Sequence, residues 1–78
     1  MVRTAEFRIS RAAEVFLAIY NVLGQRVNVL VDDLRPAGQH QVIWDGRDGD
    51  CLEAASGIYF VRLQTGEVTV TKEIVLIR

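Results

Sequence analysis

The chain has 78 residues, half of them hydrophobic, and nine basic side chains nearly balance ten acidic ones to leave a formal net charge of −1. A chain of this length forms one small domain that buries only about 60% of the surface its unfolded form exposes, which leaves little room for a deep substrate cleft. The charges alternate without a basic cluster, which argues against nucleic acid or an anionic membrane as a partner. The single cysteine, Cys51, excludes an intrachain disulfide.

Apolar and polar residues alternate over most of the chain, which is typical of strands with one buried face. The first such segment places Ala5, Phe7 and Ile9 on one side. The predicted strands are residues 4–10, 14–20, 25–31, 40–44, 57–64 and 68–78, the last being one long strand or two short ones. No window has the apolar spacing of a helix. Six to seven short strands separated by turns predict an all-β, immunoglobulin-like antiparallel β-sandwich.

Three connections carry turn residues. Residues 21–24 (NVLG) predict a tight turn, because Gly24 can adopt positive φ at low cost. Residues 32–39 contain the only proline, Pro36, and are predicted to form a loop. Residues 65–67 (TGE) predict a hairpin turn between the last two strands.

The second strand is apolar on both faces. Its core-facing set is expected to be Val15, Leu17 and Ile19. Phe16 and Ala18 then lie on the opposite face, and Ile43 is an apolar residue at an outward position of the fourth strand. Phe16 and Ile43 could cover each other on neighbouring strands, or the three residues could contact another domain or a second copy.

Candidate catalytic residues are few. The only histidine, His40, lies in an alternating strand, and the nearest nucleophile in sequence, Cys51, lies beyond a loop. Nucleophilic catalysis needs a nucleophile beside a base, and this spacing matches no such motif. We therefore expect His40 to be structural, and we predict no enzyme activity and no cofactor.

Residues 45–56, here called the acidic loop, allow two interpretations. Carboxylate oxygens are the ligands that Ca²⁺ prefers, but the spacing matches a calcium loop only loosely, so no metal site is predicted and calcium stays an alternative. The calcium candidates are Asp45, Asp48, Asp50 and Glu53. As a turn, the loop uses Asp45 to accept backbone hydrogen bonds and Gly46 and Gly49 to supply positive φ. Trp44 would then anchor it with a buried ring whose N–H reaches a carbonyl.

Several segments together are familiar: VFLAIYNVLGQRVNVLV, PAGQHQVIWDGRD, ASGIYFVRLQTG and TKEIVLIR. Over Thr4 to Arg78 they resemble the immunoglobulin-like domains of two related groups. One group is the C-terminal sorting domain of type IX (Por) secretion system cargo, and the other is the domain named after the flagellar hook-capping protein. The acidic loop of such relatives usually has glycine where this chain has Cys51.

The resemblance implies that residues 1–78 are a single C-terminal domain of a larger secreted parent. Its function would be non-catalytic: secretion, sorting and attachment at the cell surface after passage through the periplasm, recognised by the outer-membrane secretion machinery. The implied recognition strand comprises Lys72, Glu73, Ile74, Val75, Leu76, Ile77 and Arg78.

Two other functions remain open. The chain could be a structural or adhesive immunoglobulin-like spacer that contacts its parent's upstream domain, or an accessory module that binds calcium or carbohydrate. A sandwich with an unpaired last strand could also form a homodimer by strand exchange.

Overall fold

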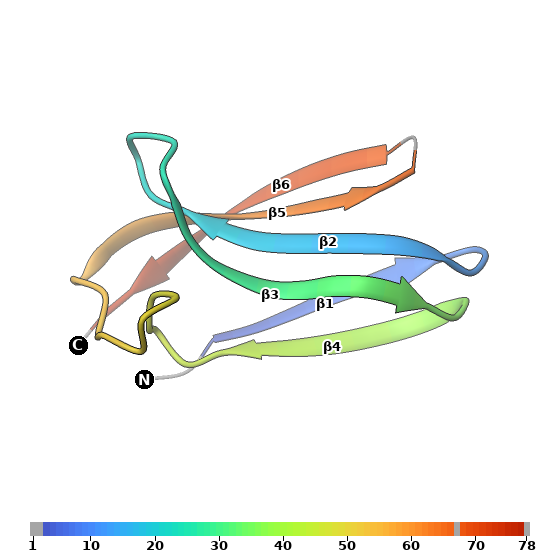
Figure 1. Ribbon diagram of the computed structural model, residues 1–78. Coiled ribbons are helices and arrows are strands. Elements are labelled where there is room, and N and C mark those ends of the chain that lie inside the picture. The colour runs from blue at the N-terminus through green and yellow to red at the C-terminus, as the bar shows by residue number, and fades with distance from the viewer. Residues whose placement is uncertain (1–2, 67, 78) are drawn as a thin grey trace.

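The computed structural model describes residues 3–66 and 68–77 and contains six strands in two antiparallel sheets (Figure 1). The strands are β1 (Arg3–Ile9), β2 (Ala13–Tyr20), β3 (Arg26–Arg35), β4 (Gly38–Trp44), β5 (Gly57–Thr65) and β6 (Val68–Leu76). One sheet contains only β1 and β4, and the other has the order β3-β2-β5-β6. The predicted immunoglobulin-like sandwich is confirmed. Within the described ranges, no helix has the length and apolar character needed to cross a membrane.

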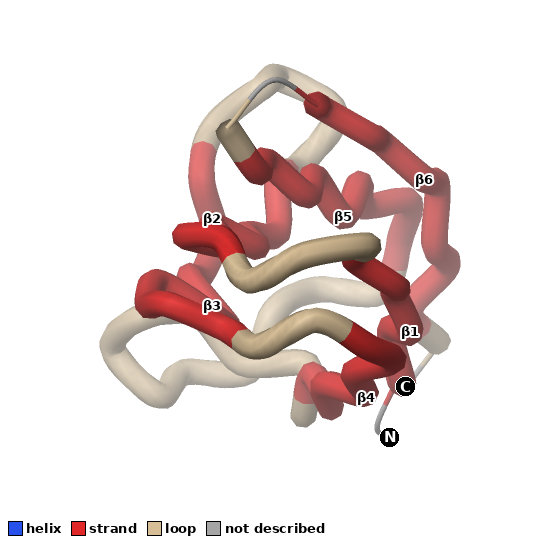
Figure 2. Tube along the Cα trace, turned by 90° about the vertical axis from the view of Figure 1, so that its right-hand side faces the viewer, coloured by secondary structure: helices blue, strands red, loops and turns tan. Residues whose placement is uncertain are grey.

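The core lies between the two sheets and is built from the alternating faces of the strands. Val15, Leu17 and Ile19 of β2 are almost completely buried, as predicted. On β5, Leu63 and Val61 lie opposite Leu17 and Ile19. In the view of Figure 2, β5 and β6 lie above this core and β1 and β4 below it. The period of two therefore identified the buried face correctly.

The predicted loop over residues 32–39 is mostly strand. β3 continues to Arg35, so its last residues still pair with the start of β2, and the turn shrinks to Pro36 and its neighbour. The charged residues here suit β3 because it is an edge strand open to water on one side. Arg35 Nε also lies 2.7 Å from Asp33 Oδ1, in an ion pair along the strand. Cross-strand pairing thus outweighed the low strand propensity of Asp.

Phe16 and Ile43 do not cover each other. Phe16 lies on β2 of the four-stranded sheet, whereas Ile43 lies on β4 of the other sheet, opposite Thr4. Ile43 is 60% exposed, while Ala18 is completely buried. The alternation pattern assigned each residue a face but not a sheet, and the three residues do not form one patch.

The start of β1 and the end of β6 lie at the same end of the sandwich (Figure 1). The acidic loop follows β4 at that end, whereas the turn between β1 and β2 lies at the opposite end. Segments joined before β1 and after β6 would therefore leave the domain from one side.

Candidate functional site

Trp44 anchors the acidic loop at the end of β4. Its buried ring makes an edge contact with Tyr59, with 5.2 Å between ring centroids. Its Nε1 donates to the carbonyl oxygen of Arg47 at 2.9 Å, and Asn28 Nδ2 donates to the same oxygen at 2.9 Å. The predicted anchor is confirmed, and the loop is held both to its own strand and to β3.

Two carboxylates organise the acidic loop from within. Asp45 Oδ1 accepts the backbone N–H of Arg47 at 3.0 Å. Asp48 Oδ1 accepts two backbone N–H groups, from Asp50 at 2.9 Å and Leu52 at 3.0 Å. The bonds from Arg47 and Asp50, each two residues after the aspartate, form Asx turns, in which a side-chain oxygen replaces a backbone acceptor. The turn interpretation of the loop agrees with this geometry.

The positive-φ residues of the loop differ in part from the prediction. Gly46 has φ of 79°, as expected, but Gly49 does not have positive φ. Cys51 takes that role with φ of 64°, among described residues the one non-glycine with positive φ. The Asp48 carboxylate fixes the backbone on both sides of Cys51, so tertiary and local hydrogen bonds impose a conformation that costs an L-residue about 1 to 2 kcal/mol.

The four calcium candidates are not assembled into a ligand set. Among the described residues, no group of three or more His, Cys, Asp or Glu side chains is placed to hold a metal ion. Asp48 directs Oδ1 at the loop's own backbone, and Glu53 forms an isolated β-bridge with Arg47. The acidic side chains thus lie at separate positions of the loop, and Asp48 stabilises the turn.

His40 has structural contacts. Its Nε2 lies 2.7 Å from the carbonyl oxygen of Pro36, and because that oxygen can only accept, Nε2 carries the proton. Its ring stacks on Phe7, opposite it on β1, with 5.1 Å between centroids. His40 lies near the start of β4, whereas the exposed Cys51 follows the far end of that strand. The two do not form a base–nucleophile pair.

A contact that the sequence analysis missed pins the start of β5. Tyr59 OH donates to the carbonyl oxygen of Ala55 at 2.6 Å. This bond resembles the tyrosine corner of immunoglobulin-like domains, in which a tyrosine near the start of a strand bonds a backbone carbonyl a few residues upstream. The sequence feature that could have predicted this hydrogen bond is the short spacing between Ser56-Gly57 and Tyr59.

The outer face of β2 carries aromatic rings that neighbouring arginines cover. Arg62 of β5 lies over the ring of Tyr20, at 4.5 Å from its centroid, and Arg26 of β3 lies 5.8 Å from the centre of the Phe16 ring. Such cation–π contacts shield the rings from water. Phe16 is therefore half-buried within its own sheet.

The expected recognition strand is an edge strand. Within the described part of the chain β6 pairs with β5 alone, so its other edge has no strand partner there. Leu76 is completely buried and Ile74 half-buried, while Lys72, Glu73, Val75 and Ile77 are exposed; Arg78 lies outside the described residues.

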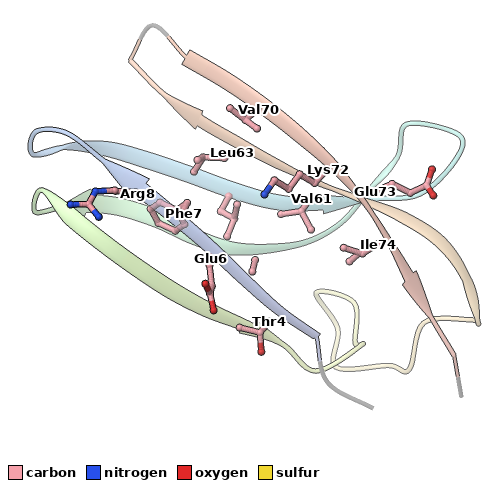
Figure 3. A pocket seen from close by; sticks show the side chains of 12 residues that line it. Thr4, Glu6, Phe7, Arg8, Val61, Leu63, Val70, Lys72, Glu73 and Ile74 are labelled. Carbon is pink, nitrogen blue, oxygen red and sulfur yellow. The ribbon is translucent and has the colours of Figure 1, made fainter.

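Beside β6 lies a groove of about 560 Å³ between the two sheets, here called the β1–β6 groove (Figure 3). Its walls are Thr4–Arg8 of β1, Val61 and Leu63 of β5, and Val70 with Lys72–Ile74 of β6; Leu17 completes the lining. Sequence reasoning missed it because alternation does not show which strands lie at the edges. We call the end of the sandwich that the acidic loop covers the closed end. The side along the β1–β6 groove is called the open side.

Comparisons with known proteins agree with this architecture. Residues 3–69 match the FlgD Ig-like domain family. A solved structure of FlgD from P. aeruginosa superposes with a TM-score of 0.76 at 22% sequence identity, which shows a shared fold. The match covers 96% of this chain and 59% of that one, so this chain spans less than two thirds of the FlgD chain. A search of curated proteins found no significant match. Since the family match extends over most of its length, the chain belongs to the FlgD Ig-like domain family.

Proposed function

We propose that this chain is a non-catalytic structural domain that projects from a larger protein of a cell-surface assembly. The observation that carries the proposal is the family match over residues 3–69, because the family is named after the flagellar hook-capping protein, part of such an assembly. The chemistry of the side chains agrees: His40 bonds a backbone carbonyl and Asp48 holds a turn, so neither is arranged for catalysis.

The position of the chain ends supports a projecting module. β1 starts and β6 ends at the same end of the sandwich, so flanking segments would leave side by side (Figure 1). A domain with adjacent ends can be inserted into, or appended to, another domain without separating that domain's own segments. A spacer strung end to end between two domains would need its termini at opposite ends.

Insertion of the 78-residue chain into an exposed loop of a reporter enzyme tests this geometry. We expect the reporter to keep its activity and the inserted domain to unfold at the melting temperature of the free chain, because adjacent ends place little strain on the host loop. The matched control inserts a flexible linker of 78 residues. Loss of reporter activity with the folded domain but not with the linker would refute the projecting arrangement.

Type IX sorting is the second candidate function, and the free edge of β6 favours it. Lys72 and Glu73 are exposed on that edge, where a translocon could read them. A fusion of a signal peptide, a folded reporter and the whole chain, expressed in a host with the type IX system, tests it. Replacing Lys72 and Glu73 together by alanine leaves the buried Leu76 in place, so this variant keeps the core intact.

The two candidates predict different locations of the reporter. A sorting module delivers the unmodified fusion to the surface and leaves the alanine variant in the periplasm. A structural module leaves both in the periplasm. Surface delivery of the unmodified fusion would overturn the structural proposal. Contact with an upstream domain of the parent stays a prediction, for which the half-buried Phe16 and the exposed Ile43 would serve as separate surfaces.

A further inference from the structure

β1 and β6 are edge strands that face each other across the open side of the sandwich. Among the described strands, β1 pairs with β4 alone and β6 pairs with β5 alone. An immunoglobulin constant-type sandwich has four strands in one sheet and three in the other, whereas the sheet of β1 and β4 has two. Every second backbone N–H and C=O of an unpaired edge points away from its sheet and can pair with another chain.

The β1–β6 groove exposes apolar side chains on the core-facing side of β6. Val68 and Val70 belong to the same face as the buried Leu76, because they pair with Thr65 and Leu63 of β5. Yet Val70 is 43% exposed and Val68 is 54% exposed, whereas Leu76 is completely buried. Towards Val68, no described element covers the inner face of β6. The groove volume falls within the range of about 300 to 1,000 Å³ of ligand pockets.

Lys72 projects from this apolar face. It lies opposite the buried Val61, and Figure 3 shows it in the groove beside Leu63 and Val61. The Lys72 side chain makes no ion pair or hydrogen bond with any residue that the structure describes. No described carboxylate lies within ion-pair distance of this ammonium group to supply a counter-charge. A carboxylate on an incoming strand would supply it.

The same charges disfavour two of the registers in which β6 could pair with β6 of a second copy. Two antiparallel copies related by a two-fold axis through Lys72 would place two ammonium groups directly opposite each other. Moving the axis to Glu73 places two carboxylates opposite each other. Like charges at directly opposed positions are destabilising, and a charge on an edge strand is a common protection against self-association. A second copy is therefore disfavoured in these two registers, whereas another sequence that places a carboxylate opposite Lys72 meets no such repulsion.

We propose that the free edge of β6 binds an extended acidic peptide strand, which extends the sheet and covers the β1–β6 groove. The strand carries a carboxylate opposite Lys72 and apolar side chains two residues before and after it, which pack on Val70 and Ile74. Backbone pairing supplies affinity and the inward side chains supply selectivity, as in other cases of strand addition to a sheet edge. This binding activity goes beyond the proposed structural role and does not depend on it.

The test uses the peptide acetyl-Thr-Val-Thr-Glu-Thr-Val-Thr-amide, whose inward face is Val, Glu, Val, together with its analogue with lysine in place of glutamate. We expect the glutamate peptide to bind the chain about tenfold more tightly than the lysine peptide. Backbone amide NMR shifts should change along β6 and at the facing residues of β1. This comparison needs no protein variant, so it holds even if a substitution impairs folding.

Charge reversal on the protein then assigns the contact. Lys72→Glu should invert the preference, so that the lysine peptide binds more tightly by about tenfold. The control is Thr71→Glu, which introduces the same carboxylate on the opposite face of the same strand and should leave both affinities within about twofold. Saturable binding with inverted preference supports the proposal.

Three outcomes would overturn it: shifts that do not saturate at about 1 mM peptide, equal affinity for both peptides, or a concentration-dependent dimer of the free chain formed through β6. The last result would show that a second copy occupies the edge.

Discussion

The closed end of this sandwich, around Trp44 and Tyr59, differs from its open side, around Val70 and Lys72, in how far side chains are buried and hydrogen-bonded. At the closed end, Trp44 and Tyr59 bury their rings while their N–H and O–H groups bond backbone carbonyls, so core and acidic loop depend on each other. At the open side, Val70 is partly exposed and the Lys72 side chain has no ion-pair or hydrogen-bond partner in the described part of the chain. The comparison indicates that stability is concentrated at the closed end, which leaves the open side free for binding.

Trp44→Ala should have the largest effect, because it removes the anchor of the closed end. The loss of a fully buried aromatic side chain costs about 3 to 5 kcal/mol in free energy of unfolding. That is a large part of the roughly 5 to 10 kcal/mol available to a small domain. Urea unfolding followed by circular dichroism measures it. The exposed neighbour Ile43→Ala is the control and should change the stability by less than about 1 kcal/mol.

Tyr59→Phe tests the hydrogen bond at the closed end without removing the ring. Only the bond from the hydroxyl to Ala55 is lost, so we expect about 1 kcal/mol of destabilisation, or a fall of about 4 to 8 °C in melting temperature. Thermal melting checks this. A variant as stable as the unmodified chain would mean that the corner contributes nothing, and that the ring contact with Trp44 alone holds this end.

Cys51→Gly should stabilise the closed end. Cys51 holds φ of 64°, a conformation that glycine adopts freely, so the substitution should add about 1 kcal/mol, reduced by the greater backbone freedom of glycine in the unfolded chain. Cys51→Val should lower stability by a similar amount, because a β-branched residue tolerates positive φ poorly. Equal melting temperatures for the two variants would contradict the assigned strain.

Lys72→Val should have the smallest effect on folding and a distinct effect on association. Lys72 is exposed and unpaired in the described chain, so the free energy of unfolding should change by less than about 0.5 kcal/mol. Removing the charge leaves the inner face of β6 with only Val68, Val70 and Ile74 exposed or half-buried beside the substituted position, so light scattering should detect self-association. A variant that stays monomeric across the same concentrations would show that Lys72 does not guard the edge.

Local patterns in the sequence were sufficient to predict the buried face of β2 and the ordered turn after Trp44. The alternation of Val15, Leu17 and Ile19 predicted the core, and the glycine and aspartate pattern after Trp44 predicted an ordered turn. These features depend on neighbours within a few residues, such as the bond from Arg47 N–H to Asp45. Short-range hydrogen bonding and the period of two therefore determined them.

Only the tertiary structure decided which strands became neighbours. Pairing of β2 with β3 extended the strand through Arg35, and the division into two sheets separated Phe16 from Ile43. The same division left the edges of β1 and β6 unpaired. The sequence by itself determined the faces of the strands, because a side chain's direction follows from its position in the alternation. Pairing decided the edges and the groove, because it depends on the sum of contacts between segments far apart in the chain.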